Sequence, residues 1–201
     1  MNTIITIGSQ YGSAGREIGS LVAKECNITY YDTELLTRAA KERGFCEEML
    51  ELHDERPTSS FLYNLVMDTY SFGYNASSFG EMPISHKIFL AQFDTIKKIA
   101  SEGPCVIVGR CADYILKDAP NVFKVFLYSD LNSEVERAIN YYGLSPENAL
   151  KEINRINKER AKHYKFYTNK NWKDFSNYDC AFNVDKYGVE KTASNIIDII
   201  K

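Results

Sequence analysis

The segment from Gly8 to Glu17 combines glycines, small residues and a cation in the order expected of an anion-binding turn. It follows a β-branched run over 3–7 and precedes apolar residues at helical spacing from Ile18 to Cys26, which predicts strand, glycine loop and helix. Backbone N–H groups of such a loop converge on an anion, and the helix N-terminus adds partial positive charge. Arg16 stands where a cation could reach a phosphate chain. The predicted phosphate-binding residues are Gly12, Ser13, Ala14, Gly15, Arg16 and Glu17.

A packing turn is the first alternative for this loop, because its sequence is not that of an ordinary Walker A motif. Gly15-Arg16-Glu17 stands where that motif has Gly-Lys-Ser/Thr, and Gln10 holds the place of its first glycine. The glycines would then only allow the strand and the helix to approach closely.

A nicotinamide-binding loop is the second alternative. The spacing of Gly8, Gly12 and Gly15 is close to that of NAD-dependent short-chain dehydrogenases, and Asp32 ends the second strand where a ribose-binding acid would lie. These enzymes also need a Tyr-x-x-x-Lys pair. The sequence offers only Tyr187 with Lys191, which is too near the C-terminus to fit.

Charged residues also follow two further predicted strands. Asp32 follows the strand 28–31, with Arg38 about two helical turns later, and Arg110 follows the buried apolar run 105–109. Parallel sheets bind ligands at the carboxyl ends of their strands, and the arginine fork matches a phosphate. The predicted acceptor-binding residues are Asp32, Arg38, Arg110 and Asp113. Arg38 as a solvated helix residue and Asp113 as a helix cap remain alternatives.

A basic stretch lies between residues 151 and 173, where eight Lys or Arg residues face only two acids, Glu152 and Glu159. A helical lid that closes over phosphates would have this composition, with Arg155 and Arg160 as its cations. A solvated helix face would look similar, and Arg155 with Glu159 could form a simple i,i+4 pair.

Length and composition indicate one globular domain over residues 1–201, with 44% hydrophobic and 25% charged residues. The formal net charge of −3 provides no basic field for nucleic acid or an anionic membrane. The five cysteines are widely spread without a CxxC pair, which argues against a disulfide framework and a cysteine zinc site. We expect a cytoplasmic protein, and a homodimer is one alternative for its oligomeric state.

Alternating strands and helices predict an α/β sandwich with a parallel sheet of about five strands. The expected strands are 3–8, 28–31, 105–109, 122–128 and 181–184. The expected helices are 18–26, 33–43, much of 45–70, 87–101, 133–142, 147–164 and 189–200.

Four segments carry a family resemblance: Tyr-Gly-Ser-Ala-Gly-Arg-Glu-Ile at 11–18, Tyr-Asp-Thr-Glu-Leu-Leu-Thr-Arg at 31–38, Val-Gly-Arg at 108–110, and the arginine-bearing stretch 155–160. Together they resemble the cytidylate kinase-like proteins, a branch of the P-loop nucleoside-monophosphate kinases. The resemblance covers nearly the whole chain. It implies a three-layer α/β/α P-loop kinase fold with an acceptor-binding helical insert at about 32–101 and a lid at about 151–173.

The resemblance implies transfer of the ATP γ-phosphoryl group to a nucleoside monophosphate or another small phosphorylated acceptor. Mg²⁺ would accompany ATP, held mainly by phosphate oxygens and water, with Asp113 or Asp32 in its outer coordination sphere. The implied catalytic residues are Arg16, Arg110, Arg155 and Arg160.

Departures from the family pattern open a second class of function. The Walker A lysine and its metal-binding hydroxyl are absent, Cys111 replaces an acid after Gly-Arg, and residues 45–85 do not match the monophosphate subdomain. A non-catalytic nucleotide or phosphometabolite binder would fit these departures. In the catalytic interpretation, Arg16 takes the place of lysine and Glu17 orients it.

Overall fold

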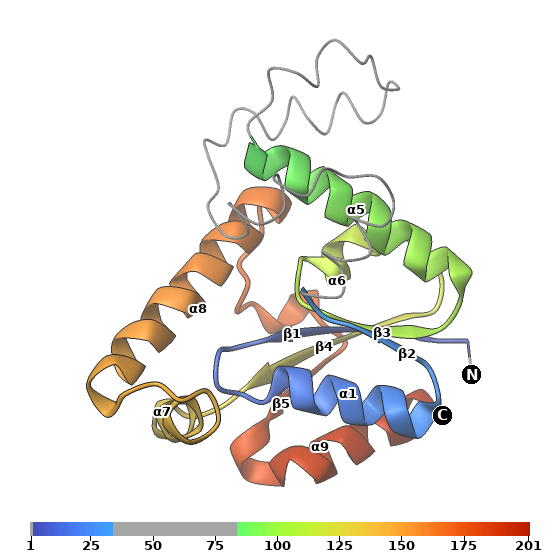
Figure 1. The fold of residues 1–201 in the computed structure, drawn as a ribbon. Coiled ribbons are helices and arrows are strands. Elements are labelled where there is room, and N and C mark those ends of the chain that lie inside the picture. The colour runs from blue at the N-terminus through green and yellow to red at the C-terminus, as the bar shows by residue number, and fades with distance from the viewer. Residues whose placement is uncertain (1, 34–83) are drawn as a thin grey trace.

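A five-stranded parallel sheet forms the centre of the protein, and the computed structural model describes residues 2–33 and 84–201. The strand order is β2-β3-β1-β4-β5, so the first strand of the chain lies in the middle (Figure 1). The strands are β1 Ile4–Ser9, β2 Thr29–Tyr31, β3 Cys105–Val108, β4 Val122–Tyr128 and β5 Cys180–Asn183. The predicted parallel sheet is confirmed.

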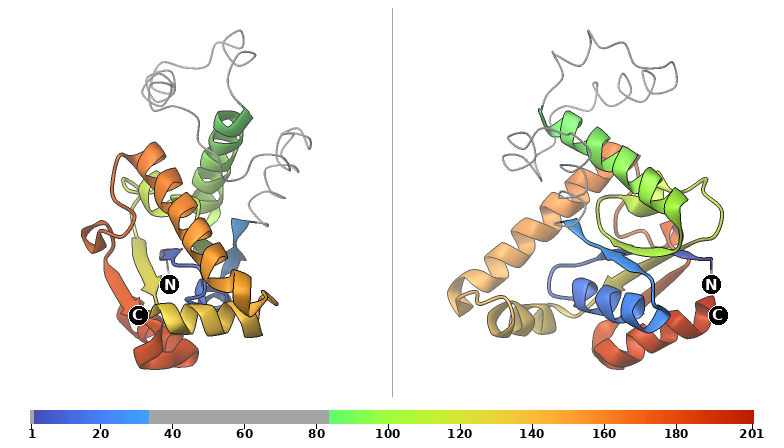
Figure 2. Two further views of the ribbon diagram at one scale, coloured as in Figure 1. Left: turned by 90° about the vertical axis from the view of Figure 1, so that its left-hand side faces the viewer. Right: turned by 45° about the vertical axis from the view of Figure 1, so that its right-hand side comes forward.

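Helices cover both faces of the sheet and complete the predicted three-layer sandwich. α1 and α9 lie together on one face, while α5 and α6 lie on the other (Figures 1 and 2). The helices are α1 Gly15–Cys26, α5 Ile84–Glu102, α6 Ala112–Ile115, α7 Leu131–Asn140, α8 Pro146–Thr168, α9 Val184–Ile200 and the 3₁₀ turn η1 Phe175–Asn177. Within the described ranges, none of them has the length and apolar character needed to cross a bilayer.

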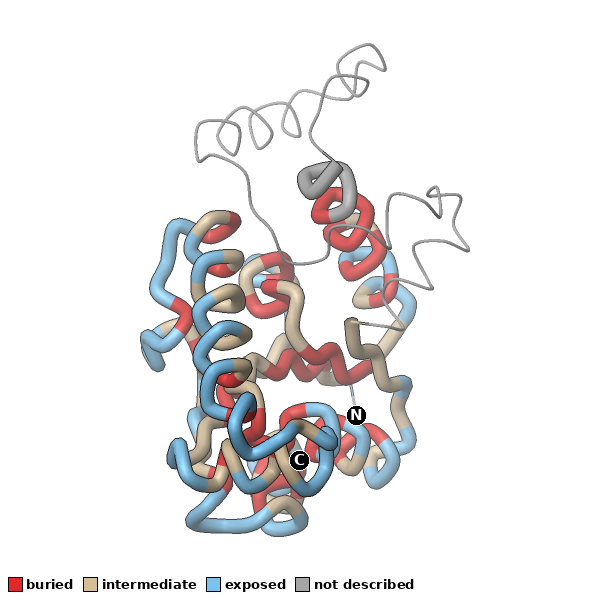
Figure 3. The backbone as a smooth tube through the Cα atoms, turned by 60° about the vertical axis from the view of Figure 1, so that its left-hand side comes forward, coloured by how far each residue is buried: buried red, intermediate tan, exposed pale blue. Residues whose placement is uncertain are grey.

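The alternation of side chains along the strands builds one apolar core on each face. Ile5 and Ile7 of β1 pack in the core that contains Ile18 of α1. Ile4 points to the opposite core, which contains Ile96 of α5. β3 is buried along its whole length and β1 over its first four residues, whereas α8 presents many exposed residues (Figure 3). The covered strands explain why their sequences read as nearly continuous apolar runs.

The register of β1 places the functional loops beside one another. Ile7 pairs with Val108 of β3, and Ser9 pairs with Leu127 of β4. The N–H of Gly109 continues this pairing by donating to the carbonyl of Ile7 at 2.9 Å. β3 lies on one side of β1 and β4 lies on the other, so the chain changes side at β1. In a parallel sheet, such a change of side opens a crevice at the carboxyl ends of the strands.

Several elements differ from the expected ones. α9 starts at Val184 rather than 189, because the side chain of Asn183 accepts the N–H of Asp185 and helical structure resumes beyond a kink at Gly188. α8 extends to Thr168 because Tyr164 and Tyr167 are buried in the core. The 3₁₀ turn η1 was not expected, and a helix at the position of α6 was expected only through the alternative that Asp113 is a helix cap. The expected helices 33–43 and 45–70, and most of the insert at 32–101, lie outside the described residues.

Gly12 provides a test of the packing between the glycine loop and α7. Its φ is +89°, and an added Cβ would lie 2.7 Å from the Cα of Glu134. Gly143 has a similar φ of +69° but open space around it. Gly143→Ala should therefore show only the left-handed strain of about 1–2 kcal/mol, whereas Gly12→Ala should lose roughly 1–3 kcal/mol more through overpacking. Urea unfolding of both variants measures the difference, and equal losses would contradict the packing.

Candidate active site

The glycine loop leads directly into the open N-terminus of α1. Ala14 is the N-cap, with a left-handed φ of 58° and no side-chain capping bond. The first N–H groups of a helix have no partner within the helix, and the helix dipole is positive there. The backbone of Gly15, Arg16 and Glu17 therefore presents donors suited to an anion.

The earlier part of the loop is packed against the protein instead. Ser13 is fully buried, and its hydroxyl lies 2.8 Å from the carbonyl oxygen of Gln10 and 3.2 Å from that of Leu127. An added Cβ on Gly15 would meet the side chain of Ser9, so this glycine is also needed for close packing. The loop thus combines the packing turn with an exposed helix start, and the two interpretations do not exclude each other.

A cavity of about 220 Å³ opens beside the loop, bounded by the ends of β1, β2 and β3 and by α8. Five predicted site residues line it: Arg16, Asp32, Arg110, Asp113 and Arg160. The other lining residues are Gly8, Ser9, Thr33, Val108, Gly109, Cys111, Glu159, His163, Tyr164 and Trp172. The fold thus gathers residues that are far apart in the sequence at one crevice.

Arg16 lines the cavity next to Asp32. Its Nε lies 3.8 Å from Oδ2 of Asp32, and its side chain is 64% exposed, so this contact is a loose ion pair. Glu17 turns the other way, toward Nη2 of Arg137 at 2.6 Å. The expectation that Glu17 orients Arg16 is therefore wrong, because Arg137 takes up the Glu17 carboxylate and Asp32 is the acid facing Arg16.

Arg110 lies in an unusual backbone segment after β3. Gly109, Arg110 and Cys111 all have positive φ, at 83°, 56° and 55°. Left-handed backbone at two successive non-glycine residues is strained and concentrates at functional sites. This turn carries the chain away from the sheet and places the Arg110 side chain at the cavity.

His163 of α8 is a neutral group at the same cavity. Its Nε2 is buried without a hydrogen-bond partner. Burial, with a smaller contribution from the charge of Arg110, lowers the pKa of His163 to about 3. Its ring packs edge-on against Tyr167 at 4.7 Å between centroids. No sequence pattern around His163 indicates that it reaches the cavity.

Asp113 is held by a hydrogen bond from α8. The Tyr164 hydroxyl donates to Oδ2 of Asp113 at 2.6 Å, and the carboxyl is only 8% exposed. Burial raises the pKa of Asp113, although the bond from Tyr164 opposes this shift. Cys111 is the N-cap of α6, so the alternative of Asp113 as that cap is wrong.

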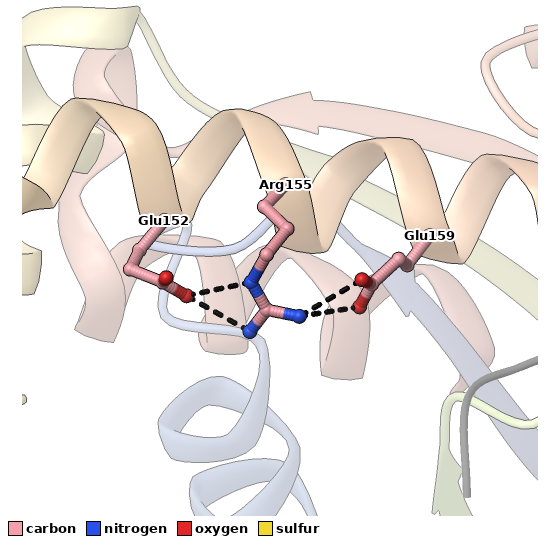
Figure 4. A network of polar contacts seen from close by, with 3 residues as sticks. All are labelled: Glu152, Arg155 and Glu159. Atoms are coloured by element: carbon pink, nitrogen blue, oxygen red, sulfur yellow. Dashed lines mark hydrogen bonds and ion pairs between the residues drawn. The ribbon is translucent and has the colours of Figure 1, made fainter.

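The two arginines predicted on the lid have different surroundings. Arg160 donates to the carbonyl oxygen of Ser9 at 2.8 Å and lines the cavity. Arg155 instead binds Glu152 and Glu159 on the surface of α8, with Nη1 at 2.8 Å from both oxygens of Glu159 (Figure 4). The i,i+4 pair is thus present, and Arg155 is not among the residues that line the cavity. Arg38 lies outside the described residues.

Carboxylates suitable for Mg²⁺ are present but sparse. Asp32 and Asp113 both line the cavity, and Mg²⁺ commonly takes one or two carboxylates together with substrate phosphates. Within residues 2–33 and 84–201, no group of three or more His, Cys, Asp or Glu side chains is arranged to hold a metal. The residues present fit a metal carried in by phosphates rather than one caged by the protein.

Solved structures of other proteins share this fold. The chain resembles an uncharacterized protein from Eubacterium ventriosum ATCC 27560, with 26% identity, 98% of each chain covered and a TM-score of 0.73. It also resembles shikimate kinase from Bacteroides thetaiotaomicron, with 14% identity, 100% of this chain and 99% of that chain covered, and a TM-score of 0.54. Shikimate kinase from Acinetobacter baumannii in complex with shikimate is 12% identical, with 100% of this chain and 93% of that chain covered and a TM-score of 0.53.

The chain shares the fold of these P-loop kinases. Because the sequence identities to the shikimate kinases are so low, these two likenesses show the fold alone. A sequence profile of the cytidylate kinase-like family matches residues 4–186. The chain therefore belongs to the cytidylate kinase-like family, and family and fold together support a nucleotide-dependent phosphotransferase. No curated protein matches the sequence significantly.

The Asp113–Tyr164 bond predicts a pH-dependent stability effect. The raised pKa means that native Asp113 holds its proton more tightly than the unfolded chain, so it costs stability as pH rises through the native pKa. Tyr164→Phe should therefore destabilise by about 1–3 kcal/mol at roughly pH 8 and by less at roughly pH 4, because the carboxyl takes up a proton as the pH falls.

Thr192→Val is the control for this prediction. The buried Thr192 hydroxyl donates to the backbone carbonyl of Gly188, an acceptor that does not titrate. Denaturant unfolding at the two pH values should show a larger change with pH for Tyr164→Phe than for Thr192→Val. Equal changes would mean that the Tyr164 hydroxyl does not stabilise an ionised Asp113.

Proposed function

We propose that the protein transfers the γ-phosphoryl group of ATP to a small phosphorylated acceptor, most naturally a nucleoside monophosphate of the cytidylate type. The observation that carries this proposal is the convergence of Arg16, Arg110 and Arg160 on one cavity beside the open start of α1. Each arginine comes from a different element. Such a cluster suits two phosphate groups that must be brought together despite their mutual repulsion.

The donor phosphates are proposed to bind at the start of α1. The N–H groups of the first turn, from Gly15 to Glu17, would bind phosphate oxygens, and the Arg16 guanidinium would add a charged fork. The contact between Arg16 and Asp32 is loose, so a phosphate can replace it at small cost.

The acceptor phosphate is proposed to bind at the far side of the cavity. Arg110 would bind it there, together with Arg38 from the segment after β2. Asp32 and Asp113 would contact the remainder of the acceptor, and neutral His163 leaves the positive charge to the arginines. Arg160, anchored on the Ser9 carbonyl, lies where it can bridge the donor and acceptor sides.

Phosphoryl transfer of this kind needs positioning and charge neutralisation rather than a protein nucleophile. Mg²⁺ brought by ATP would neutralise charge on the phosphate oxygens, with Asp32 or Asp113 held beyond its direct ligands. The side chains would align the two phosphates, and α8 would limit the access of water.

A second candidate function is nucleotide or phosphometabolite binding without turnover. Glu17 favours this candidate, because it stands where the Walker A motif has the Ser/Thr hydroxyl that binds Mg²⁺. Its carboxylate is instead bound to Arg137. The Ser13 hydroxyl is likewise directed at backbone carbonyls. Release of ADP from ATP and Mg²⁺, assayed with and without each nucleoside monophosphate, separates the candidates. Acceptor-dependent release supports the kinase, and binding of ATP without any release supports the binder.

The role of Arg16 predicts a ranked loss of affinity for MgADP. Arg16→Ala should weaken binding by about 2–3 kcal/mol, the scale of a hydrogen bond between charged groups. Arg16→Lys should lose less, because an ammonium keeps the charge but not the two parallel hydrogen bonds. Lys24→Ala, near the C-terminus of the same helix, is the control and should bind normally. Calorimetry measures the ranking, and three equal affinities for residue 16 would show that Arg16 does not contact phosphate.

The lid arginines give a second test of the same site. If α8 acts in the position seen here, Arg160→Ala should lower kcat by about 10- to 100-fold, while Arg155→Ala should leave it near wild type. If α8 closes further and delivers Arg155, as the sequence predicts, both variants should lose activity. Steady-state kinetics with the nucleoside monophosphate that gives the fastest ADP release decide between these positions, and full activity of Arg160→Ala would refute its role.

A further inference from the structure

We propose that Asn157 and Glu134 are positioning residues that hold the first half of the glycine loop in its phosphate-binding shape. This inference rests on the proposed binding of nucleotide phosphates by the loop. Neither residue lines the cavity. Both act through the backbone of residues 9–12, which we term the rising limb of the loop.

A chain of hydrogen bonds joins this limb to α7 and α8. The Tyr11 N–H donates to Oδ1 of Asn157 at 2.8 Å, across 146 positions of sequence. The Asn157 amide group in turn donates from Nδ2 to Oε2 of Glu134 at 3.4 Å. Asn157 thus takes up a backbone donor of the loop that no regular secondary structure would satisfy.

Packing fixes the same limb from several sides. Gly12 lies so close to the backbone of Glu134 that no Cβ would fit between them. The Tyr11 ring packs against the small apolar core shared by α7 and α8, which contains Ala138 and Ile153. Arg160 lies over the Tyr11 ring at 5.7 Å and donates to the carbonyl of Ser9. The loop therefore takes its shape partly from α7 and α8.

Glu134 determines which way the Asn157 amide points. An ionised carboxylate only accepts hydrogen bonds, so it selects the NH₂ end of the amide. The carbonyl end then faces the Tyr11 N–H, as required for the observed bond. With a proton on the carboxyl oxygen nearest Asn157, the amide would be driven to turn and two donors would face each other at Tyr11.

The surroundings of Glu134 make its charge sensitive to pH. The residue is 2% exposed, and its Oε1 is buried with no hydrogen-bond partner. Burial raises its pKa to about 7, opposed by Lys173, the Asn157 bond and Arg160 of α8, and reinforced by Asp185 of α9. Above this pH the carboxylate orients Asn157, and below it the orientation weakens.

Asn157 could instead occupy a donor that phosphate needs, in which case removing it would improve binding. The geometry favours positioning, because Tyr11 lies at the start of the loop. The backbone N–H donors without a partner inside the helix lie four to six positions later, in the first turn of α1. The sign of the change in affinity separates the two possibilities.

The test uses the full-length protein with Asn157→Ala, Glu134→Gln and the exposed α8 control Asn154→Ala. Amide exchange of Tyr11 without ligand is followed by NMR, and MgADP affinity is measured by calorimetry at about pH 6 and about pH 8. Asn157→Ala should speed Tyr11 exchange and raise Kd by about 5- to 30-fold, the effect of losing one hydrogen bond. Asn154→Ala should change neither.

Glu134→Gln provides the readout that a merely structural role would not change. Its amide oxygen can still accept from Asn157 but does not titrate, so Kd should stay near the wild-type value at about pH 8. The wild-type affinity should fall more than that of Glu134→Gln between about pH 8 and about pH 6. Comparing the two proteins cancels the titration of the nucleotide itself.

Each remaining outcome is decisive. Unchanged Tyr11 exchange in Asn157→Ala, an unchanged or lower Kd, or parallel pH dependences for wild type and Glu134→Gln would overturn the inference while leaving the proposed function intact. Wild type that fails to bind MgADP would overturn the proposed function, and this inference with it.

Discussion

The parallel pairing of β1 between β3 and β4 is the constraint on which the rest of the structure depends. This pairing brings the ends of separate strands to one edge of the sheet, where Ser9, Asp32 and Gly109 lie around a common cavity. β3 lies on one side of β1 and β4 on the other, so the chain crosses β1 between these two strands, and parallel sheets bind ligands at such a point. A shift in the β1 register by one residue would exchange its two apolar faces and move the glycine loop away from α7.

Around that crevice, the arginines line the cavity, while most of the neighbouring acids bind other partners. Asp32 contacts Arg16 only loosely. Glu17 is bound to Arg137, Glu159 to Arg155, and Asp113 to the Tyr164 hydroxyl. Each of these acids therefore has a partner other than the cavity arginines within hydrogen-bond distance. The result is a cavity whose arginines can respond to phosphate despite the net negative charge of the chain.

Much of the architecture could be predicted from the sequence, because periodic apolar runs report burial directly. The run 105–109 indicated a covered strand, and the glycines after β1 indicated a loop leading into a helix. The placement of Arg16, Asp32 and Arg110 at one edge followed from the rule that strand ends carry ligands. That rule needs only element order, which the sequence shows.

The remaining features depend on contacts over long sequence separations, which local patterns do not show. Nothing near Asn157 indicates that it accepts the Tyr11 N–H, and nothing near Glu17 indicates that Arg137 will bind it. The packing of Tyr164 and Tyr167 was hidden by the charged residues around them, so the stretch was predicted to be either a lid or a solvated helix face. Strain at Arg110 and Cys111 is likewise a product of the tertiary fold.

The central claim is that the start of α1 and the arginines of the cavity form a nucleotide-phosphate site. A crystal structure of the wild-type protein with ADP and Mg²⁺ tests it most directly. The account predicts the β-phosphate on the N–H groups of residues 15–17, with the Arg16 guanidinium turned from Asp32 to a phosphate oxygen. A nucleotide bound elsewhere, or phosphates at this loop with Arg16 still directed at Asp32, would contradict it.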